Sequence, residues 1–196
     1  MSTSVLRGDP RSRGRRRSRL WIAAALVVVL VGAAFLVRAT VVAPFRVPSS
    51  SMAPLLRPGD IVLVDRMRGG RATRGEVVVF DGRGYFADGP AGGGFFVKRV
   101  IGIGGDHVQC CDEQGRIELN GSPLAEPYLP AGMRPSAVAF DVRVPAGTMF
   151  VLGDDRADSA DSRAYLGAPG GGMVPVDRVL GPVTTLVWPI AGNRKL

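Results

Sequence analysis

The sequence predicts a mainly β protein, in which a single N-terminal transmembrane helix is followed by an all-β domain. Three observations lead to this fold class. Residues 20–37 form an uncharged, apolar run of eighteen residues. From residue 41 onward, short runs rich in β-branched residues alternate with Gly and Pro. No segment after the apolar run keeps apolar residues at helical spacing over several turns.

The apolar run lies between Arg19 and Arg38, and as a helix it covers most of the hydrocarbon core of a bilayer, which is about 30 Å thick. Residues 1–19 hold seven arginines and one acid, an excess typical of the cytoplasmic side. We therefore expect a basic cytoplasmic tail at 1–19, a transmembrane anchor at 20–38 and an extracytoplasmic domain at 39–196. The alternative is a cleaved secretory signal, but its apolar core usually has only about 7 to 15 residues.

The net charge of +8 belongs mainly to the tail, which contributes +6 and leaves +2 for the rest of the chain. A domain that binds nucleic acid carries its basic residues on the folded part. The charge distribution therefore argues against a nucleic-acid partner, and it favours the lipid bilayer as the surface that the tail and anchor contact.

The strands of the domain are expected in five short apolar runs. These runs are residues 60–65, 76–80, 95–101, 142–144 and 149–152. Asn120-Gly121 predicts a tight hairpin turn, because both central residues of such a turn need positive φ. The Gly-rich stretches 82–94 and 167–172 lack the strand–loop–helix setting of a phosphate-binding loop.

Cysteine and histidine are too scarce to predict a metal centre, and we expect no cofactor. Cys110 and Cys111 are adjacent, and we favour two thiols in a turn over a vicinal disulfide because pairing adjacent residues is strained. His107 is the only histidine. It leaves a Ser–His–Asp triad open, but it follows Gly104-Gly105-Asp106, a predicted turn that is a poor place to orient a base.

Lys98 stands out because the chain has 23 arginines and only one other lysine, Lys195. Lysine can act as a base once burial lowers its pKa, whereas arginine does not deprotonate. Strand alternation places Phe96, Lys98 and Val100 on one face of the predicted strand, and Val97 and Arg99 on the other. The alternative is a structural lysine whose amine reaches solvent or a carboxylate.

Two polar segments accompany this lysine. Pro48 and Pro54 bracket three serines directly after the anchor, a rigid turn able to present a hydroxyl nucleophile, although a Pro/Ser-rich linker has the same composition. The segment 151–163, VLGDDRADSADSR, is a dense polar loop after an apolar strand. Its carboxylates are compatible with a calcium site, but its two arginines argue against one because they would occupy the carboxylates.

Together these segments resemble the bacterial type I signal peptidase family, in order and spacing, over most of residues 41–185. The matching segments are PSSSM at 48–52, GDIVLVDR at 59–66, RGEVVVF at 74–80, FVKRVIGIGGD at 96–106, NGSPLAEPYL at 120–129, VLGDDRADSADSR at 151–163 and GMVPVDRVLG at 172–181. The resemblance implies a Ser/Lys dyad, with Ser51 as the nucleophile and Lys98 as its general base. It implies no metal and no cofactor.

Further roles follow from the resemblance alone. Ser49 is implied to assist the oxyanion hole and Ser159 to orient the lysine. Asp161 and Arg163 are implied to form a supporting ion pair beside the site, and Asp154 to belong to the same support. Positions lining shallow pockets for small substrate side chains are implied at Phe45, Val47, Pro48, Met52 and Val97. The chain departs from the family signature at Asp155, Ala157 and Asp158, and these departures leave the nucleophile and the base unchanged.

The expected function is therefore a membrane-bound endopeptidase, a monomer, that removes signal peptides from exported precursors. Its location would be the cytoplasmic membrane, with the catalytic domain on the extracytoplasmic side. Three other hypotheses stay open: a relative serving one narrow client, an autoprotease of the kind found in SOS repressors, and a degenerate domain that binds export clients without cutting them. The anchor argues against the second, and the presence of both Ser51 and Lys98 argues against the third.

Overall fold

The computed structural model describes residues 21–22, 24–33, 41–86, 94–189 and 194–195. The chain divides into two compact units, Met1–Thr40 and Val41–Leu196. In the first unit, residues 21–22 and 24–33 are helical. No helix within the described residues is both long and apolar enough to cross a membrane. The predicted tail and residues 20, 23 and 34–38 of the predicted anchor lie outside the described residues.

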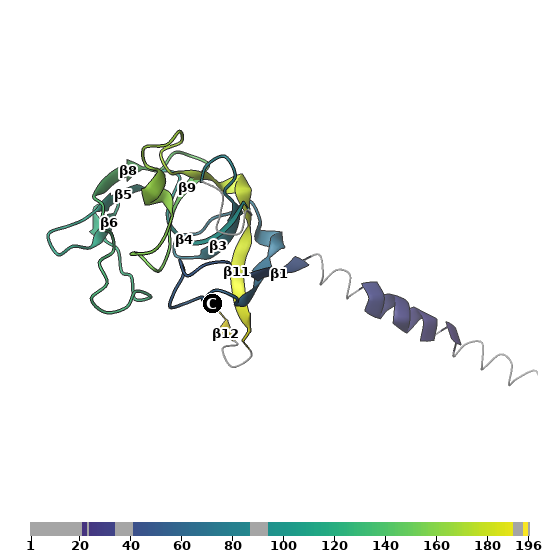
Figure 1. The fold of residues 1–196 in the computed structure, drawn as a ribbon. Coiled ribbons are helices and arrows are strands. Elements are labelled where there is room, and N and C mark those ends of the chain that lie inside the picture. Colours follow the sequence, from purple (N-terminus) through teal and green to yellow (C-terminus); the bar gives the residue numbers. More distant parts are fainter. Residues whose placement is uncertain (1–20, 23, 34–40, 87–93, 190–193, 196) are drawn as a thin grey trace, which may run out of the picture. The chain divides into compact units, whose positions relative to one another are not determined.

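The second unit is built from antiparallel strands, which confirms the prediction of a mainly β domain (Figure 1). Its described strands are β1 (Val42–Arg46), β2 (Ile61–Asp65), β3 (Val77–Asp81), β4 (Phe95–Ile103), β5 (His107–Cys110), β6 (Ile117–Leu119), β7 (Ser122–Pro123), β8 (Phe140–Arg143), β9 (Thr148–Leu152), β10 (Val174–Pro175), β11 (Val179–Trp188) and β12 (Arg194–Lys195). Three 3-10 helices join them: η1 (Arg66–Arg68), η2 (Ser162–Tyr165) and η3 (Val176–Arg178).

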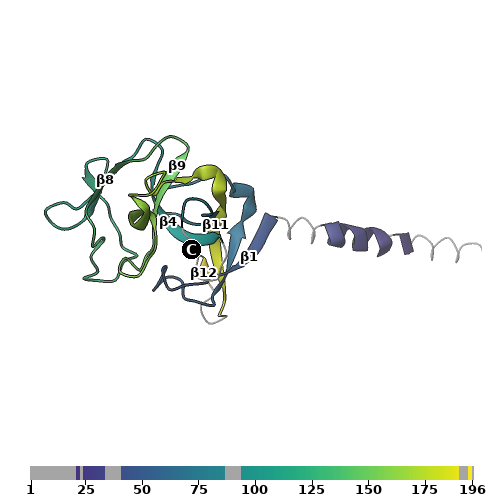
Figure 2. The same cartoon turned by 45° about the horizontal axis from the view of Figure 1, so that its top comes forward.

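The larger sheet is curled because one long strand pairs on both sides through bulges. Its order is β1-β2-β11-β3-β4-β9-β10, with β12 also paired to β11. Bulges interrupt the register of β11 against β2 and against β3, and Figure 2 shows the resulting curl of β4 and β11. One bulge contains Gly181, where any Cβ would overlap the carbonyl of Asp65. Glycine is therefore required for this close approach of two strands.

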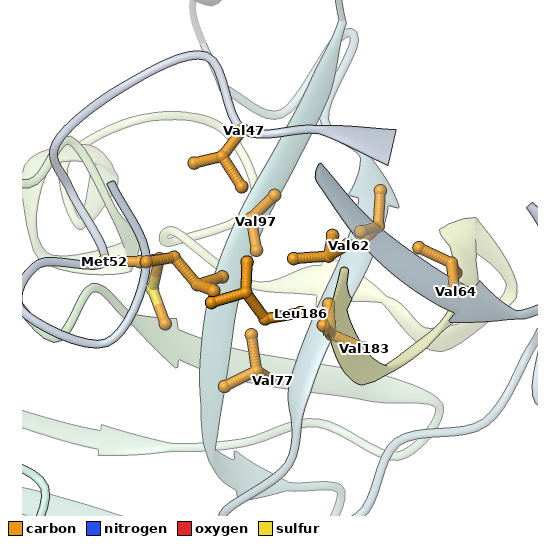
Figure 3. Close-up of a cluster of buried hydrophobic side chains, with 10 residues drawn as sticks. Val47, Met52, Val62, Val64, Val77, Val97, Val183 and Leu186 are labelled. Carbon is orange, nitrogen blue, oxygen red and sulfur yellow. The ribbon is translucent and has the colours of Figure 1, made fainter. Parts of the chain in front are cut away.

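Strand β4 is central to this sheet and is buried on both faces. Phe96 and Val100 pack on one side in a cluster with Phe80, whereas Val97 packs on the other side in a cluster with Met52. Figure 3 shows this second cluster, to which Val47 and Met52 bring the chain segment between β1 and β2. The predicted alternation along this strand is confirmed. A lysine at position 98 is thus held in the middle of a paired strand.

The smaller sheet has the order β7-β6-β5-β8 and lies next to the larger one through a shared apolar cluster that includes Ile101, Val108 and Phe150. The predicted hairpin turn is confirmed, because Asn120 and Gly121 have φ values of 55° and 75° between β6 and β7. The cysteines contradict the prediction of two thiols. The sulfur atoms of Cys110 and Cys111 are bonded to each other at the end of β5, and the described residues contain no free cysteine.

Candidate active site

Ser51 lies in a tight turn that follows Pro48. Ala53 N–H donates to the carbonyl of Ser50 at 2.7 Å, and Leu56 N–H donates to the carbonyl of Met52 at 2.8 Å. Met52 is fully buried, so its side chain anchors the turn in the apolar cluster of Figure 3 while Ser51 stays 7% exposed. The proline before the turn and the buried methionine after the serine therefore fix the position of the Ser51 hydroxyl.

The amine of Lys98 reaches this hydroxyl. Nζ of Lys98 lies 2.6 Å from Oγ of Ser51, across 47 positions of sequence. A second hydroxyl, Oγ of Ser49, donates to Oγ of Ser51 at 3.2 Å. The Ser51 N–H has no hydrogen-bond acceptor within the part of the chain that the structure describes. The site thus holds a hydroxyl, an amine in hydrogen-bonding contact with it, and an unpaired backbone donor on the same residue.

Burial favours the neutral amine of Lys98. Only 3% of this residue is exposed, and burial lowers its pKa from 10.5 to about 8. The carboxylates of Asp161 and Asp154 act in the opposite direction, and the guanidinium of Arg163 lowers the pKa further. Because no carboxylate bonds to Nζ directly in the described residues, a substantial fraction of the amine is neutral near pH 8.

Arg99, the next residue of β4, points to the other face, where its positive charge has several partners. Its Nε and Nη2 donate to the two carboxylate oxygens of Asp154 at 2.8 and 2.6 Å. Its Nη1 donates to the carbonyl of Gly75 at 2.7 Å. The ring of Tyr128 lies 3.9 Å from the guanidinium carbon. This buried cation is therefore paired on every side by groups from three separate segments.

We call residues 153–163 the acidic loop and residues 49–53 the Ser51 turn, and the two segments pack side by side. Asp155 N–H donates to the carbonyl of Ser51 at 3.1 Å, and the Ser50 hydroxyl donates to Asp158 at 3.1 Å. A Cβ at Gly153 would overlap the Ser51 carbonyl and the Ser159 hydroxyl. The backbone of the acidic loop therefore lies against the backbone of the Ser51 turn, and this close approach requires glycine at position 153.

The predicted pair of Asp161 and Arg163 is present in the acidic loop. Nη2 of Arg163 lies 2.8 Å from Oδ2 of Asp161, and the Asp161 side chain is fully buried. The same carboxylate accepts a hydrogen bond from Gly153 N–H at 3.0 Å and caps η2 at the N–H of Arg163. Asp161 therefore holds both ends of the loop together, as well as placing a negative charge near Lys98.

Ser159 differs from the expectation. Its hydroxyl oxygen is buried without any hydrogen-bond partner in the described residues, so it makes no contact of this kind with Lys98. The lysine amine instead bonds to the Ser51 hydroxyl. The hydrogen bond expected between Ser159 and Lys98 is therefore not formed in this structure.

The predicted pocket residues are only partly brought together. Val47, Met52 and Val97 are buried side by side in one cluster, and Phe45 packs against it half-buried. Pro48 is exposed and lies outside that cluster. Three of the five predicted positions thus belong to a buried core cluster next to the Ser51 turn, with Phe45 packed against it.

Two alternative chemistries find no support in the geometry. Nε2 of His107 lies 2.6 Å from a carboxylate oxygen of Asp141 in the small sheet, and no hydrogen bond joins His107 to Ser51 in the described part of the chain. Among the described residues, no group of three or more His, Cys, Asp or Glu side chains is arranged to hold a metal ion. Of the four acids considered for calcium, Asp154, Asp155, Asp158 and Asp161, the first and the last are paired with arginines.

Sequence reasoning missed the role of Arg99, Tyr128 and Glu126 around the site. Arg99 is a charged residue in the middle of an apolar strand, and a buried arginine is almost always paired, so the sequence could have predicted a partner for it. Tyr128 and Glu126 belong to the matching segment NGSPLAEPYL, whose contacts with the acidic loop join residues about 30 positions apart. Nothing local in the sequence indicates that contact.

Comparisons of the sequence with a family model and with known relatives agree on one family. The family model described as signal peptidase, peptidase S26, matches residues 19–188. Signal peptidase I of Mycobacterium tuberculosis (strain ATCC 25618 / H37Rv) is 34% identical over 222 positions, covering 90% of this chain and 75% of that protein. Signal peptidase I U of Bacillus subtilis (strain 168) is 30% identical, covering 86% and 88%. A crystal structure of a signal peptidase I from Enterococcus faecalis V583 matches with a TM-score of 0.44 and 27% identity, covering 58% of this chain and 97% of that one.

Proposed function

Because this chain belongs to the signal peptidase family, peptidase S26, and is therefore a peptidase, we propose that it cleaves N-terminal signal peptides from exported precursor proteins with a Ser51/Lys98 dyad. The observation that carries the proposal is the 2.6 Å contact between the buried Lys98 amine and the Ser51 hydroxyl. The names of the relatives support the substrate class, since both are called signal peptidase I or a variant of it.

The reaction begins when neutral Lys98 accepts the Ser51 proton while Oγ attacks the scissile carbonyl carbon. The tetrahedral oxyanion is stabilised by the free Ser51 N–H and by the Ser49 hydroxyl, which turns from Ser51 Oγ toward the new charge. One such donor is commonly worth roughly 3 kcal/mol. When the C–N bond breaks, Lys98 returns the proton to the leaving amine of the mature protein, and the signal peptide stays esterified to Ser51.

The second half-reaction repeats these steps with water. Lys98 takes a proton from the attacking water, the ester carbon forms its bond to the water oxygen, and the Ser51–carbon bond breaks. The proton then returns to Ser51 Oγ, which frees the signal peptide with a new carboxyl terminus. Every proton transfer uses the same amine, so a single base with a pKa of about 8 serves both half-reactions.

Supporting roles are assigned to the residues around the dyad. Asp161 with Arg163, and Asp154 with Arg99, form ion pairs that hold the acidic loop beside Lys98. The unpartnered hydroxyl of Ser159 accepts a hydrogen bond from Lys98 once Ser51 engages the substrate. We assign the shallow contacts with small substrate side chains to half-buried Phe45 and exposed Pro48, while Val47, Met52 and Val97 support them from the buried cluster behind.

The cellular setting follows the same proposal. The basic tail stays in the cytoplasm, residues 20–38 anchor the chain in the membrane, and the domain from residue 39 works on the extracytoplasmic side as a monomer. This arrangement is supported by the arginine excess of the tail and the uncharged run after it. It keeps the active site near the membrane surface, where the cleavage junction of a translocated precursor emerges.

The test is precursor cleavage by the purified full-length protein in detergent, with an Ala-x-Ala junction in the precursor. We expect the wild type to cut after the second Ala, as read from the N-terminal sequence of the product, and Ser51→Ala and Lys98→Ala to be inactive. Full activity of Lys98→Ala contradicts the dyad. A wild-type protein that cuts none of several precursors contradicts the proposed function and favours a narrow client or binding without cleavage.

A further inference from the structure

The segment that follows β7 of the small sheet extends to the active site, where it contacts Arg99, Arg156 and Arg163. We call residues 124–136, which follow β7, the strap. Glu126 of the strap accepts a hydrogen bond from Arg156 at 2.5 Å, and the carbonyl of Pro135 accepts one from the same guanidinium at 2.9 Å. Arg163 approaches the hydroxyl of Ser136 at 3.4 Å. The strap therefore covers the acidic loop with several polar contacts.

Tyr128 gives the strap its closest approach to the dyad. Its ring lies over the guanidinium of Arg99, 3.9 Å from the guanidinium carbon, and the same guanidinium donates to the carboxylate of Asp154. The phenol hydroxyl donates to Glu126 at 2.9 Å, so the ring is fixed by the same acid that binds Arg156. Arg99 thus has an aromatic ring over its face and a carboxylate at its N–H edge, and it directly follows Lys98 along β4.

The charges that face Lys98 are all held in pairs. From the acidic loop and η2 these are Asp154, Asp161 and Arg163, and from β4 itself Arg99. The residue paired with Lys98 on β3 is the uncharged Val78, and the Ser51 turn contributes the neutral hydroxyl of Ser51. An acid released from its arginine would attract a proton to the lysine and so oppose its action as a base.

We propose that Tyr128 is a positioning residue for the Ser51/Lys98 dyad, and that the strap keeps Asp154 paired with Arg99 so that Lys98 stays available as a base. The ring does so by stacking on the guanidinium, which restricts it to the orientation that offers two N–H groups to Asp154. The inference rests on the proposed function, because it concerns the same dyad, but its central readout does not require catalysis.

The chain allows a direct measurement, because Lys98 and Lys195 are its only lysines. Protein labelled with 13C at lysine Cε shows two lysine signals in detergent, and the Lys195→Arg variant assigns them. The pH titration of the Lys98 signal then reports the protonation of the base in the intact chain. The same samples give kcat and KM for precursor cleavage across the pH range.

In Tyr128→Leu we expect the Lys98 midpoint to rise by about half a pH unit, because Asp154 is then held less firmly by Arg99 and its charge acts more strongly on the lysine amine. The acidic limb of kcat/KM should move by the same amount, and kcat at pH 7 should fall about threefold with KM unchanged. Tyr128→Phe, which keeps the ring over Arg99, should keep the wild-type midpoint.

Leu124→Ala is the matched control for a loosened strap. Leu124 packs against the apolar cluster between the sheets and makes no contact with Arg99 in the described residues, so its truncation should lower the melting temperature and leave the Lys98 midpoint unchanged. An unchanged midpoint in Tyr128→Leu overturns the inference, as does an equal rise in Leu124→Ala. If the wild type cleaves no precursor, the proposed function fails, while the titration still decides the role of Tyr128.

Discussion

Lys98 and Arg99 are neighbours on β4, and the two sides of this strand treat a buried cation in opposite ways. Lys98 is 3% exposed and its amine bonds to a neutral hydroxyl. Arg99 is 9% exposed and has a bidentate carboxylate, a backbone carbonyl and an aromatic ring as partners. The lysine side favours loss of the proton, whereas the arginine side makes the charge permanent.

The contrast supports a division of roles on one strand, in which Arg99 contributes to stability and Lys98 to the proposed chemistry. A buried ion that lacks a partner costs free energy, and that cost is what lowers the pKa of Lys98 to about 8. The pairs of Arg99 with Asp154 and Arg163 with Asp161 fix the surroundings without adding net charge. Four substitutions or conditions test this division, beginning with the largest effect.

Replacing Lys98 with Met should remove activity and leave the fold intact. A general base contributes about 10² to 10⁴-fold, so we expect cleavage to fall by roughly 10³-fold, while the apolar chain suits a site next to Val78. Single-turnover cleavage and thermal unfolding at pH 7 measure the two effects. A variant that loses activity together with its cooperative unfolding would show that the amine also holds the structure.

On the other side of the strand, Asp154→Ala should act mainly on stability. It leaves the guanidinium of Arg99 buried without its carboxylate, a change that costs about 3 to 5 kcal/mol when one partner of a buried pair is lost. Urea unfolding measures this loss of stability. Asp158→Ala is the control, because Asp158 is exposed and forms no ion pair within the described residues. Equal stability of the two variants contradicts the comparison.

The sequence indicated the proposed dyad better than the packing around Arg99 on the other side of β4. Short runs of β-branched residues predicted five of the described strands, and the rarity of lysine together with PSSSM pointed to Ser51 and Lys98. Tyr128 stacks on Arg99 only because the strap crosses back from the small sheet, a long-range contact that no local pattern encodes. The pairing of β11 with β3 depends on a bulge at Gly181, which no pattern in the sequence indicates. The bond between Cys110 and Cys111 likewise depends on the path of the chain after β5.

The pH dependence of stability should separate the two cations. An unfolded lysine keeps its proton up to its ordinary pKa of 10.5, whereas folded Lys98 releases it near about 8. The unfolded state therefore binds more protons between these values, and stability rises with pH in this window. The interval corresponds to about 3 kcal/mol, from about 1.4 kcal/mol per unit. Urea unfolding of the wild type minus that of Lys98→Met isolates this contribution, and a flat difference contradicts a lowered pKa.

The smallest effect is expected at Ser159, whose hydroxyl is buried without a partner on the lysine side of the strand. Removing an unsatisfied buried hydroxyl relieves a penalty of about 1 kcal/mol, so Ser159→Ala should be as stable as the wild type or slightly more stable. Its kcat should nevertheless fall about tenfold, because a hydrogen bond to the lysine in the transition state is worth about 1.4 kcal/mol. Unfolding and kcat are measured on the same samples, with Ser136→Ala as the control. Loss of stability without loss of kcat would assign Ser159 to the structure of the acidic loop and leave Lys98 oriented by Ser51 and its own strand.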